Sequence, residues 1–240
     1  MRKVAVMMGA GTSALLVAGA LGLALTAAPR ASRAAGGAAV KGKVTTTAPA
    51  STGAHTITKN PEVCGAPAPK VEEVVVGAGG ALANVVVAVA APTPTPLKTM
   101  TVSVDQKGCR YDPHVQASTV GSDLVLKNSD TVLHNVHTFL DGKLTLFNVG
   151  MPMKDMTVKK KLKGPGVVSF KCDAGHTWMS AYIVTFNHPY FAVTGADGTF
   201  KIDGVPAGTY TASFWHEKLG AKTASVTVPA SGEVVSNVSF

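Results

Sequence analysis

The sequence predicts an all-β fold, and three observations support that prediction. The 240-residue chain contains 25 Gly and 14 Pro, and Val and Thr are frequent outside its N-terminal segment. No long segment shows the 3.6-residue periodicity of an amphipathic helix. Short apolar runs are instead separated by turn sequences, as in β-sandwiches. Without its N-terminal segment the chain has about 205 residues, which is enough for one large or two small cores.

Residues 1–34 are expected to be a signal peptide. Met1 is followed by Arg2 and Lys3, then by an uncharged Ala/Gly/Leu-rich run over 4–29 and small residues around Arg33. This is the layout of an export signal, so we expect a periplasmic or extracellular protein. The apolar run is long enough to span a membrane if the signal is not cleaved, which leaves an N-terminal anchor as the alternative.

Much of the positive charge belongs to this segment. The whole chain has a formal net charge of +8, whereas the 18 basic and 14 acidic residues after position 34 give +4. No Arg/Lys stripe with interleaved aromatic residues is present, so nucleic-acid binding has little support. The basic run at 159–161 and Lys163 is interpreted as a solvated strand or loop.

Strands are expected in order along the chain. Residues 40–45 form the first, and the Val-rich run 81–89 follows a Gly-rich turn and suits a buried strand. Alternating prolines over 92–96 indicate an extended connector and a domain crossing. The next predicted strands are 100–104, 123–126, 132–139 and 166–172. After 187, Asp-Gly and Pro-x-Gly turns separate short strands over 194–210, and 222–228 and 233–240 are the last two.

Three potential metal ligands lie within eight residues at the end of the strand 166–172. They are Cys172, His176 and Met179, and His134 lies further upstream. Strand alternation puts the Cys172 thiol on the same face as two apolar side chains, so it points into a core. One thiolate, two imidazoles and a weak axial thioether are the ligands of a mononuclear blue-copper centre. This pattern predicts one copper ion and the transfer of single electrons.

Two segments resemble the cupredoxin family. Residues 128–136 read NSDTVLHNV and resemble the segment that delivers the first histidine ligand, and 165–172 read PGVVSFKC and resemble the strand that ends in the ligand cysteine. The resemblance covers about 97–187 and implies a Greek-key sandwich. It assigns equatorial roles to His134, Cys172 and His176, the axial role to Met179, and an outer-shell hydrogen bond to Asn135.

The spacing of the ligands also disfavours one related centre. The pattern Cys-x3-His-x2-Met matches half of the binuclear copper motif of respiratory oxidases, which needs another Cys where this chain has Val168. Relatives of the mononuclear type have one residue fewer between Cys and His, so Gly175 lengthens this loop.

The cysteine count predicts one disulfide. An exported chain with three cysteines is expected to have one pair and one special thiol. Cys172 has ligand neighbours, which leaves Cys64 and Cys109 to pair.

The flanking segments resemble a carboxypeptidase regulatory-like domain, which has a transthyretin-like fold. Residues 40–44 and 82–87 resemble its first half, and 197–202 and 206–210 its second half. The expected domains are therefore 35–96 and 188–240, two parts of a small sandwich, and 97–187, the copper domain inserted in it or joined to it. A Cys64–Cys109 disulfide would connect the first part of the small sandwich to the copper domain. That family has no peptidase chemistry, and the chain shows no catalytic triad or zinc-peptidase motif. Nothing in the sequence identifies a substrate, so we do not expect an enzyme.

Several alternatives stay open from the sequence. Zinc could bind one Cys and two His, and the protein could be a metal-free structural or carbohydrate-contacting sandwich. Met151, Met153 and Met156 allow a copper-delivery role, because thioethers are soft ligands. His137 faces away from His134 on a strand and is not expected to bind metal. The expected partner is a redox protein such as a c-type cytochrome or an oxidase.

Overall fold

The computed structural model describes residues 37–93 and 97–240. Strands make up nearly all of its regular structure, so the predicted all-β class is confirmed. Among the described residues, the helical elements are α1 (Pro61–Cys64) and the short 3-10 turn η1 (Ala78–Gly80). No helix in this part of the chain is long and apolar enough to cross a membrane. The expected signal peptide lies outside the described residues.

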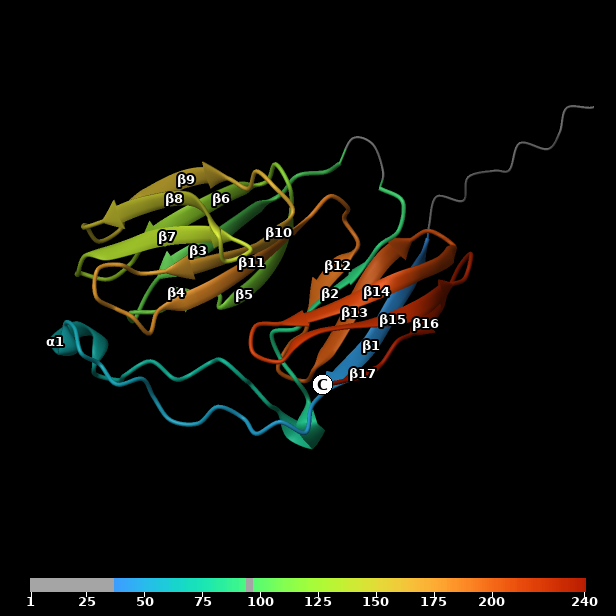
Figure 1. Ribbon diagram of the computed structural model, residues 1–240, viewed down its shortest axis with the longest axis horizontal. Coiled ribbons are helices and arrows are strands. Elements are labelled where there is room, and N and C mark those ends of the chain that lie inside the picture. Colours follow the sequence, from blue (N-terminus) through green and yellow to red (C-terminus); the bar gives the residue numbers. More distant parts are fainter. Residues whose placement is uncertain (1–36, 94–96) are drawn as a thin grey trace, which may run out of the picture. The chain divides into compact units, whose positions relative to one another are not determined.

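Strands from both ends of the described chain form the first sandwich (Figure 1). One sheet has the order β13-β1-β16, with β17 also paired to β1, and the other has the order β12-β2-β14-β15. The strands of this sandwich are β1 (Ala38–Thr45), β2 (Val86–Val89), β12 (Phe191–Val193), β13 (Thr199–Val205), β14 (Gly208–His216), β15 (Gly220–Val228), β16 (Glu233–Val235) and β17 (Val238–Ser239).

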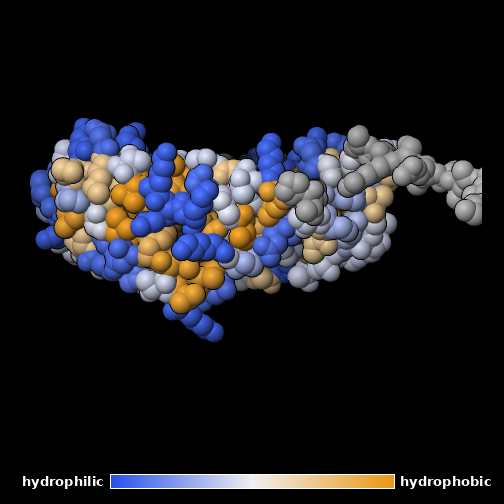
Figure 2. All heavy atoms as spheres, turned by 90° about the horizontal axis from the view of Figure 1, so that it is seen from above, coloured by the Kyte–Doolittle hydropathy of each residue, from blue (hydrophilic) through white to orange (hydrophobic). Residues whose placement is uncertain are grey.

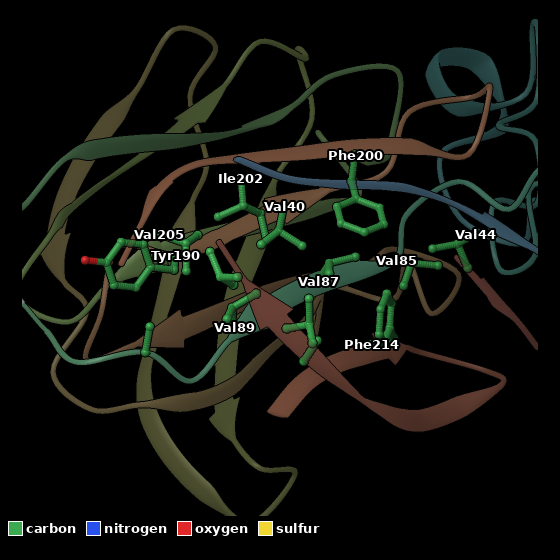
Figure 3. Packing of buried hydrophobic residues seen from close by; sticks show 14 of the residues in the cluster. Val40, Val44, Val85, Val87, Val89, Tyr190, Phe200, Ile202, Val205 and Phe214 are labelled. Atoms are coloured by element: carbon green, nitrogen blue, oxygen red, sulfur yellow. The ribbon is translucent and has the colours of Figure 1, made fainter. Parts of the chain in front are cut away.

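Apolar side chains from these two sheets meet in one core. In Figure 3 the side chains of β1 and β13, such as Val40 and Phe200, face those of β2 and β14, such as Val87 and Phe214. The rings of Phe200 and Phe214 pack edge to face with centroids 5.9 Å apart. Val40, Val87 and Phe214 are fully buried. Burial of this Val-rich surface is the main favourable contribution to the stability of the sandwich.

Two predicted strands are shorter than the sequence indicated. The run 81–89 becomes strand only from Val86, because Asn84 adopts a left-handed conformation (φ 61°) that interrupts an extended strand. Residues 81 and 82 make only isolated bridges. Likewise 233–240 splits into β16 and β17, both parallel to β1, and the Ser236 N–H between them donates to the Lys41 carbonyl.

The strands between β2 and β12 form the second sandwich. Its sheets have the orders β5-β11-β10-β7-β8 and β4-β3-β6-β9. The strands are β3 (Thr101–Gln106), β4 (Tyr111–Asp112), β5 (Val115–Thr119), β6 (Asp123–Asn128), β7 (His134–Leu140), β8 (Leu144–Met151), β9 (Thr157–Lys161), β10 (Gly166–Lys171) and β11 (Ser180–Phe186).

The segment between β1 and β2 does not stay with the first sandwich. It carries α1 to one end of the second sandwich and then returns to β2 (Figure 1). A disulfide joins Cys64 of α1 to Cys109, which lies between β3 and β4, so the disulfide predicted from the cysteine count is present. Both cysteines are buried in the core of the second sandwich. The bridge therefore fixes α1 to this end.

The strands β8 and β9 are edge strands. The sequence did not predict β8, whereas β9 contains the basic run 159–161 that was interpreted as a solvated strand or loop. Hydrophobic residues gather over this region and hydrophilic side chains cross them (Figure 2). Leu144 is 60% exposed, and the Lys160 ammonium lies 5.4 Å from the centroid of the Phe147 ring. The basic run 159–161 thus lies on an edge strand, where lysine side chains discourage pairing with another sheet.

Candidate metal centre

The four predicted ligands lie at one end of the second sandwich. His134 begins β7, and Cys172 directly follows β10, the antiparallel neighbour of β7. His176 and Met179 belong to the loop between β10 and β11. All four side chains are buried, and Cys172 is the most exposed of them at 5%. Adjacent strand ends thus bring His134 close to a loop that lies some forty residues later in sequence.

Three donor atoms converge in this buried space. His134 Nδ1 and His176 Nδ1 lie 3.2 Å apart, and Cys172 Sγ lies 3.6 Å from His176 Nδ1. These three side chains form a group in which each ligand atom lies within 4.8 Å of the others. The Met179 N–H donates to the His176 carbonyl (3.0 Å) and closes the turn between them.

The outer ring nitrogens show that this donor set fits a metal ion. His134 Nε2 lies 2.9 Å from an Asp130 carboxylate oxygen, and His176 Nε2 lies 3.1 Å from Asn60 Oδ1. The Asn60 amide nitrogen donates to Glu62 (3.2 Å), which orients its oxygen toward His176. Because both partners are acceptors, each Nε2 can donate its proton to its partner, and each Nδ1, when unprotonated, can present a lone pair to a metal ion. Two lone pairs and a thiol sulfur facing one point favour a cation between them.

The electrostatics of the two imidazoles differ. Burial opposes the charged form of His134, but its hydrogen bond to Asp130 and the nearby Cys172 thiol outweigh burial and raise its pKa. Burial, together with the positive charges of His134 and Lys59, lowers the pKa of His176 to about 4. His176 is therefore unprotonated near neutral pH, as a metal ligand must be.

Asp130 is the outer-shell partner of His134. Burial opposes its charged form, but hydrogen bonds from His134 and from the Cys109 and Gly108 N–H groups (2.8 Å each) lower its pKa. A carboxylate that binds the outer nitrogen of a ligand imidazole fixes its tautomer and raises its basicity.

Asn135 links β7 to the cysteine loop. Its N–H donates to Cys172 Sγ (3.3 Å), and its side-chain oxygen accepts a hydrogen bond from the Asp173 N–H (3.1 Å). His137 lies outside the donor group: its Nδ1 is 2.7 Å from Asp173 Oδ2, and its ring lies against Phe139 with centroids 4.1 Å apart. The loop that holds Cys172 is therefore hydrogen-bonded to β7 both at the thiol and at the residue after it.

Sequence reasoning missed three residues that surround the centre. Asp130 lies four residues before His134, a spacing that could have suggested it. Asn60 lies 116 residues from His176 and has no local signal. The Trp178 ring lies edge to face against His176 with centroids 5.3 Å apart, and its indole N–H donates to the Cys109 carbonyl (2.9 Å). The sequence motif includes Trp178, but it does not indicate that Trp178 contacts His176 and Cys109.

The comparisons with solved structures return copper proteins at low similarity. A purple cupredoxin from Nitrosopumilus maritimus is 18% identical and matches 35% of this chain and 99% of its own. A mutant of amicyanin in the Cu(I) form is 18% identical, and the match covers 42% of this chain and 98% of the amicyanin chain. A copper-containing nitrite reductase from Thermus scotoductus SA-01 is 17% identical, and the match covers 41% of this chain and 25% of the reductase chain. All three have a TM-score of 0.32, which is too low to assign a family.

One family model matches part of the sequence. A family model described as polysaccharide lyase family 4, domain II, matches residues 163–236. This match covers less than half of the chain and spans strands of both sandwiches. No curated protein sequence matches the chain.

Proposed function

We propose that the protein is an exported carrier of single electrons with one mononuclear copper ion. His134, Cys172 and His176 would hold the ion, and Met179 would be the weak axial ligand. The observation that carries this proposal is the convergence of two Nδ1 atoms and one thiol sulfur in a buried space. Copper bound there would supply a one-electron couple between Cu(I) and Cu(II).

The donor set favours copper over zinc. Structural zinc sites take four tight ligands from Cys, His, Asp and Glu. Here two His and one Cys converge, and the next candidate in the loop is the thioether of Met179, which suits copper. Asp130 is already engaged by the outer nitrogen of His134 and by two backbone N–H groups.

Burial of the ligands favours electron transfer over catalysis. All four ligand residues are at least 95% buried, so the site offers no open position to a substrate. The hydrogen bonds of Asn135 to Cys172 and Asp173 hold the thiol loop in place, and a fixed ligand set limits the rearrangement that accompanies a change of one electron. We therefore propose that the protein is not an enzyme and that its partner is a redox protein, such as a c-type cytochrome or an oxidase, in the periplasm or outside the cell.

Two other functions are alternatives that copper titration distinguishes from electron transfer. A metal-free structural or carbohydrate-contacting protein is the main alternative, and the partial match to a polysaccharide lyase domain is the observation in its favour. Copper delivery would use exposed methionines. Met153 is 64% exposed, but Met151 is buried and its sulfur accepts a hydrogen bond from Gln106 (3.0 Å). The two thioethers therefore differ in accessibility.

Copper(II) titration of the purified full chain tests the proposal. We expect intense visible absorption from charge transfer between the Cys172 thiolate and copper, saturating at one ion per chain. Cys172→Ser should abolish the colour. Met179→Leu should keep most of it and raise the reduction potential, because the axial ligand tunes the potential. Met153→Leu is the matched control and should change neither. Undiminished colour in Cys172→Ser, or no colour in the unmodified protein, would reject the proposal.

A further inference from the structure

Residues 59–64 cover one edge of the candidate metal centre, and we call them the cap. Asn60 accepts the hydrogen bond from His176 Nε2, and side-chain carbons of Lys59 lie 3.5–3.9 Å from the position that a Cβ on Gly175 would occupy. The His176 ring is fully buried. The cap therefore closes the loop side of the centre, although it comes from the segment that precedes β2.

The cap has an unusual backbone at the residue that makes the contact. Asn60 is left-handed (φ 49°, ψ 53°), a conformation that Asn tolerates better than most residues. Its carbonyl accepts hydrogen bonds from the N–H groups of Val63 (3.1 Å) and Cys64 (2.9 Å). The orientation of the Asn60 side chain is thus tied to the short helix that ends at Cys64.

The disulfide connects this cap to the support of the other imidazole. Cys64 is bonded to Cys109, and the Cys109 N–H donates to Asp130, which binds His134 Nε2. A sulfur of the bridge and the ligand atoms of Asp130 and His134 lie within 4.8 Å of one another, and both sulfurs lie within that distance of a ring nitrogen of His176. One covalent bond therefore joins the segment that contains Asn60 to the residue whose N–H binds Asp130.

Trp178 gives a second connection between His176 and the bridge. Its ring packs against His176, and its indole N–H donates to the Cys109 carbonyl. Cys109 is thus connected to His176 through Trp178 and to His134 through Asp130. Outer-shell groups of this kind orient the ligands and control their affinity for metal.

We propose that Asn60 is the positioning residue for His176 and that the disulfide-held cap closes the metal centre to solvent and external ligands. This inference rests on the proposed function, because it gives a role to residues around that centre. The cap would hold the His176 ring with Nδ1 facing His134 and Cys172. Loss of the Asn60 side chain or of the disulfide would expose His176.

Chemical modification of the metal-free full chain tests the cap without copper. Diethylpyrocarbonate acylates accessible imidazole nitrogens, and mass spectrometry gives the rate at each histidine. Asn60→Gly removes the side chain and keeps the left-handed backbone. Asn84→Gly is the matched control, because Asn84 is also left-handed (φ 61°) but lies in the first sandwich. Partly exposed His137 is the internal reference within each sample.

We expect His176 to be protected in the unmodified protein and in Asn84→Gly. Its rate should rise about tenfold in Asn60→Gly, the factor that corresponds to a lost hydrogen bond of about 1.4 kcal/mol. A rise at least as large is expected when Cys64 and Cys109 are both replaced by Ser. A rate in Asn60→Gly within about twofold of the unmodified protein would overturn the role of Asn60, since a change that small is less than the loss of even a weak hydrogen bond. Unchanged protection in the double Ser variant would overturn the role of the disulfide.

A second measurement needs no variant and so does not depend on folding. Long-range proton–nitrogen NMR of the metal-free protein reports which ring nitrogen of His176 carries the proton. The inference requires the Nε2–H form, and an Nδ1–H form would contradict it. Protection of His176 in a protein that binds no copper would reject the proposed function and leave the cap intact, so the two failures are distinguishable.

Discussion

Replacing the Glu217 carboxylate, by Glu217→Gln, is expected to destabilise the protein in a pH-dependent way. Glu217 forms an ion pair with Nε2 of His114, and both side chains are at least 92% buried. His114 Nδ1 lies 3.1 Å from the Ser180 carbonyl. Both partners of the ring are acceptors, so both of its nitrogens carry protons and His114 is a buried imidazolium. A hydrogen bond between charged groups contributes about 2 kcal/mol.

The sign of the pH dependence follows from the raised pKa of His114. Burial opposes its charge, but the hydrogen bond and the charge of Glu217, with a smaller effect of Glu72, raise the pKa. Tyr182 and His216 also interact electrostatically with Glu217, and His55, Lys70, Glu73 and Arg110 line the same pocket as the pair. Below the unfolded-state pKa of about 6.5, folded and unfolded chains both hold the proton and the contribution is complete. As pH rises toward the folded-state pKa, only the folded chain holds it, and stability falls by up to about 1.4 kcal/mol per pH unit.

Urea unfolding measures this effect. The unmodified protein and Glu217→Gln are compared from about pH 5.5 to about pH 9, a range that brackets the ordinary histidine pKa. We expect a difference in unfolding free energy of about 2 kcal/mol at the acid end, which shrinks as pH rises. Glu73→Gln is the control, because Glu73 is 44% exposed and pairs with Lys218 at the surface. A difference that stays constant over this range, or grows with pH, would refute the assignment of His114 as a buried cation.

Two further predictions concern the centre and its bridge. Replacing both Cys64 and Cys109 by Ser should lower the unfolding free energy by about 4 kcal/mol, the chain-entropy value for a sequence separation of 45; a calorimetric loss below about 1 kcal/mol would count against this. His134→Gly should remove the visible band of the copper-loaded protein, and added imidazole should restore it, whereas His137→Ala should leave the band in place. An equal loss in both variants would mean that the ligand assignment on β7 is wrong.

Local patterns in the sequence predict much of the second sandwich. Alternation at Val168, Phe170 and Cys172 places three side chains on one face, and all three are buried.

Two strands were not predicted correctly. The left-handed Asn84 shortened the predicted strand 81–89 of the first sandwich, because β-propensity alone does not indicate where a backbone turns. Edge strand β8 was missed because its side chains alternate weakly between exposed and half-buried positions. A period-2 pattern is strong only where one face is covered.

The surroundings of the centre could be predicted only in part. Met179 and the two histidines follow from residue types and spacing, since the metal demands a particular donor set. Asn60 supports His176 from 116 residues away, through a short helix that the Cys64–Cys109 bridge fixes in place. Such a contact depends on the tertiary path of the chain between two sandwiches. No local periodicity encodes that path.

Spectroelectrochemical titration of the copper-loaded full chain tests the central claim most directly. The visible band should disappear on reduction and return on oxidation, following a one-electron Nernst curve with one copper ion per chain. Electron transfer at a mononuclear centre built on Cys172 requires this reversibility. A band that does not respond to potential, a curve for two electrons, or a loss of copper on each reduction would contradict the account.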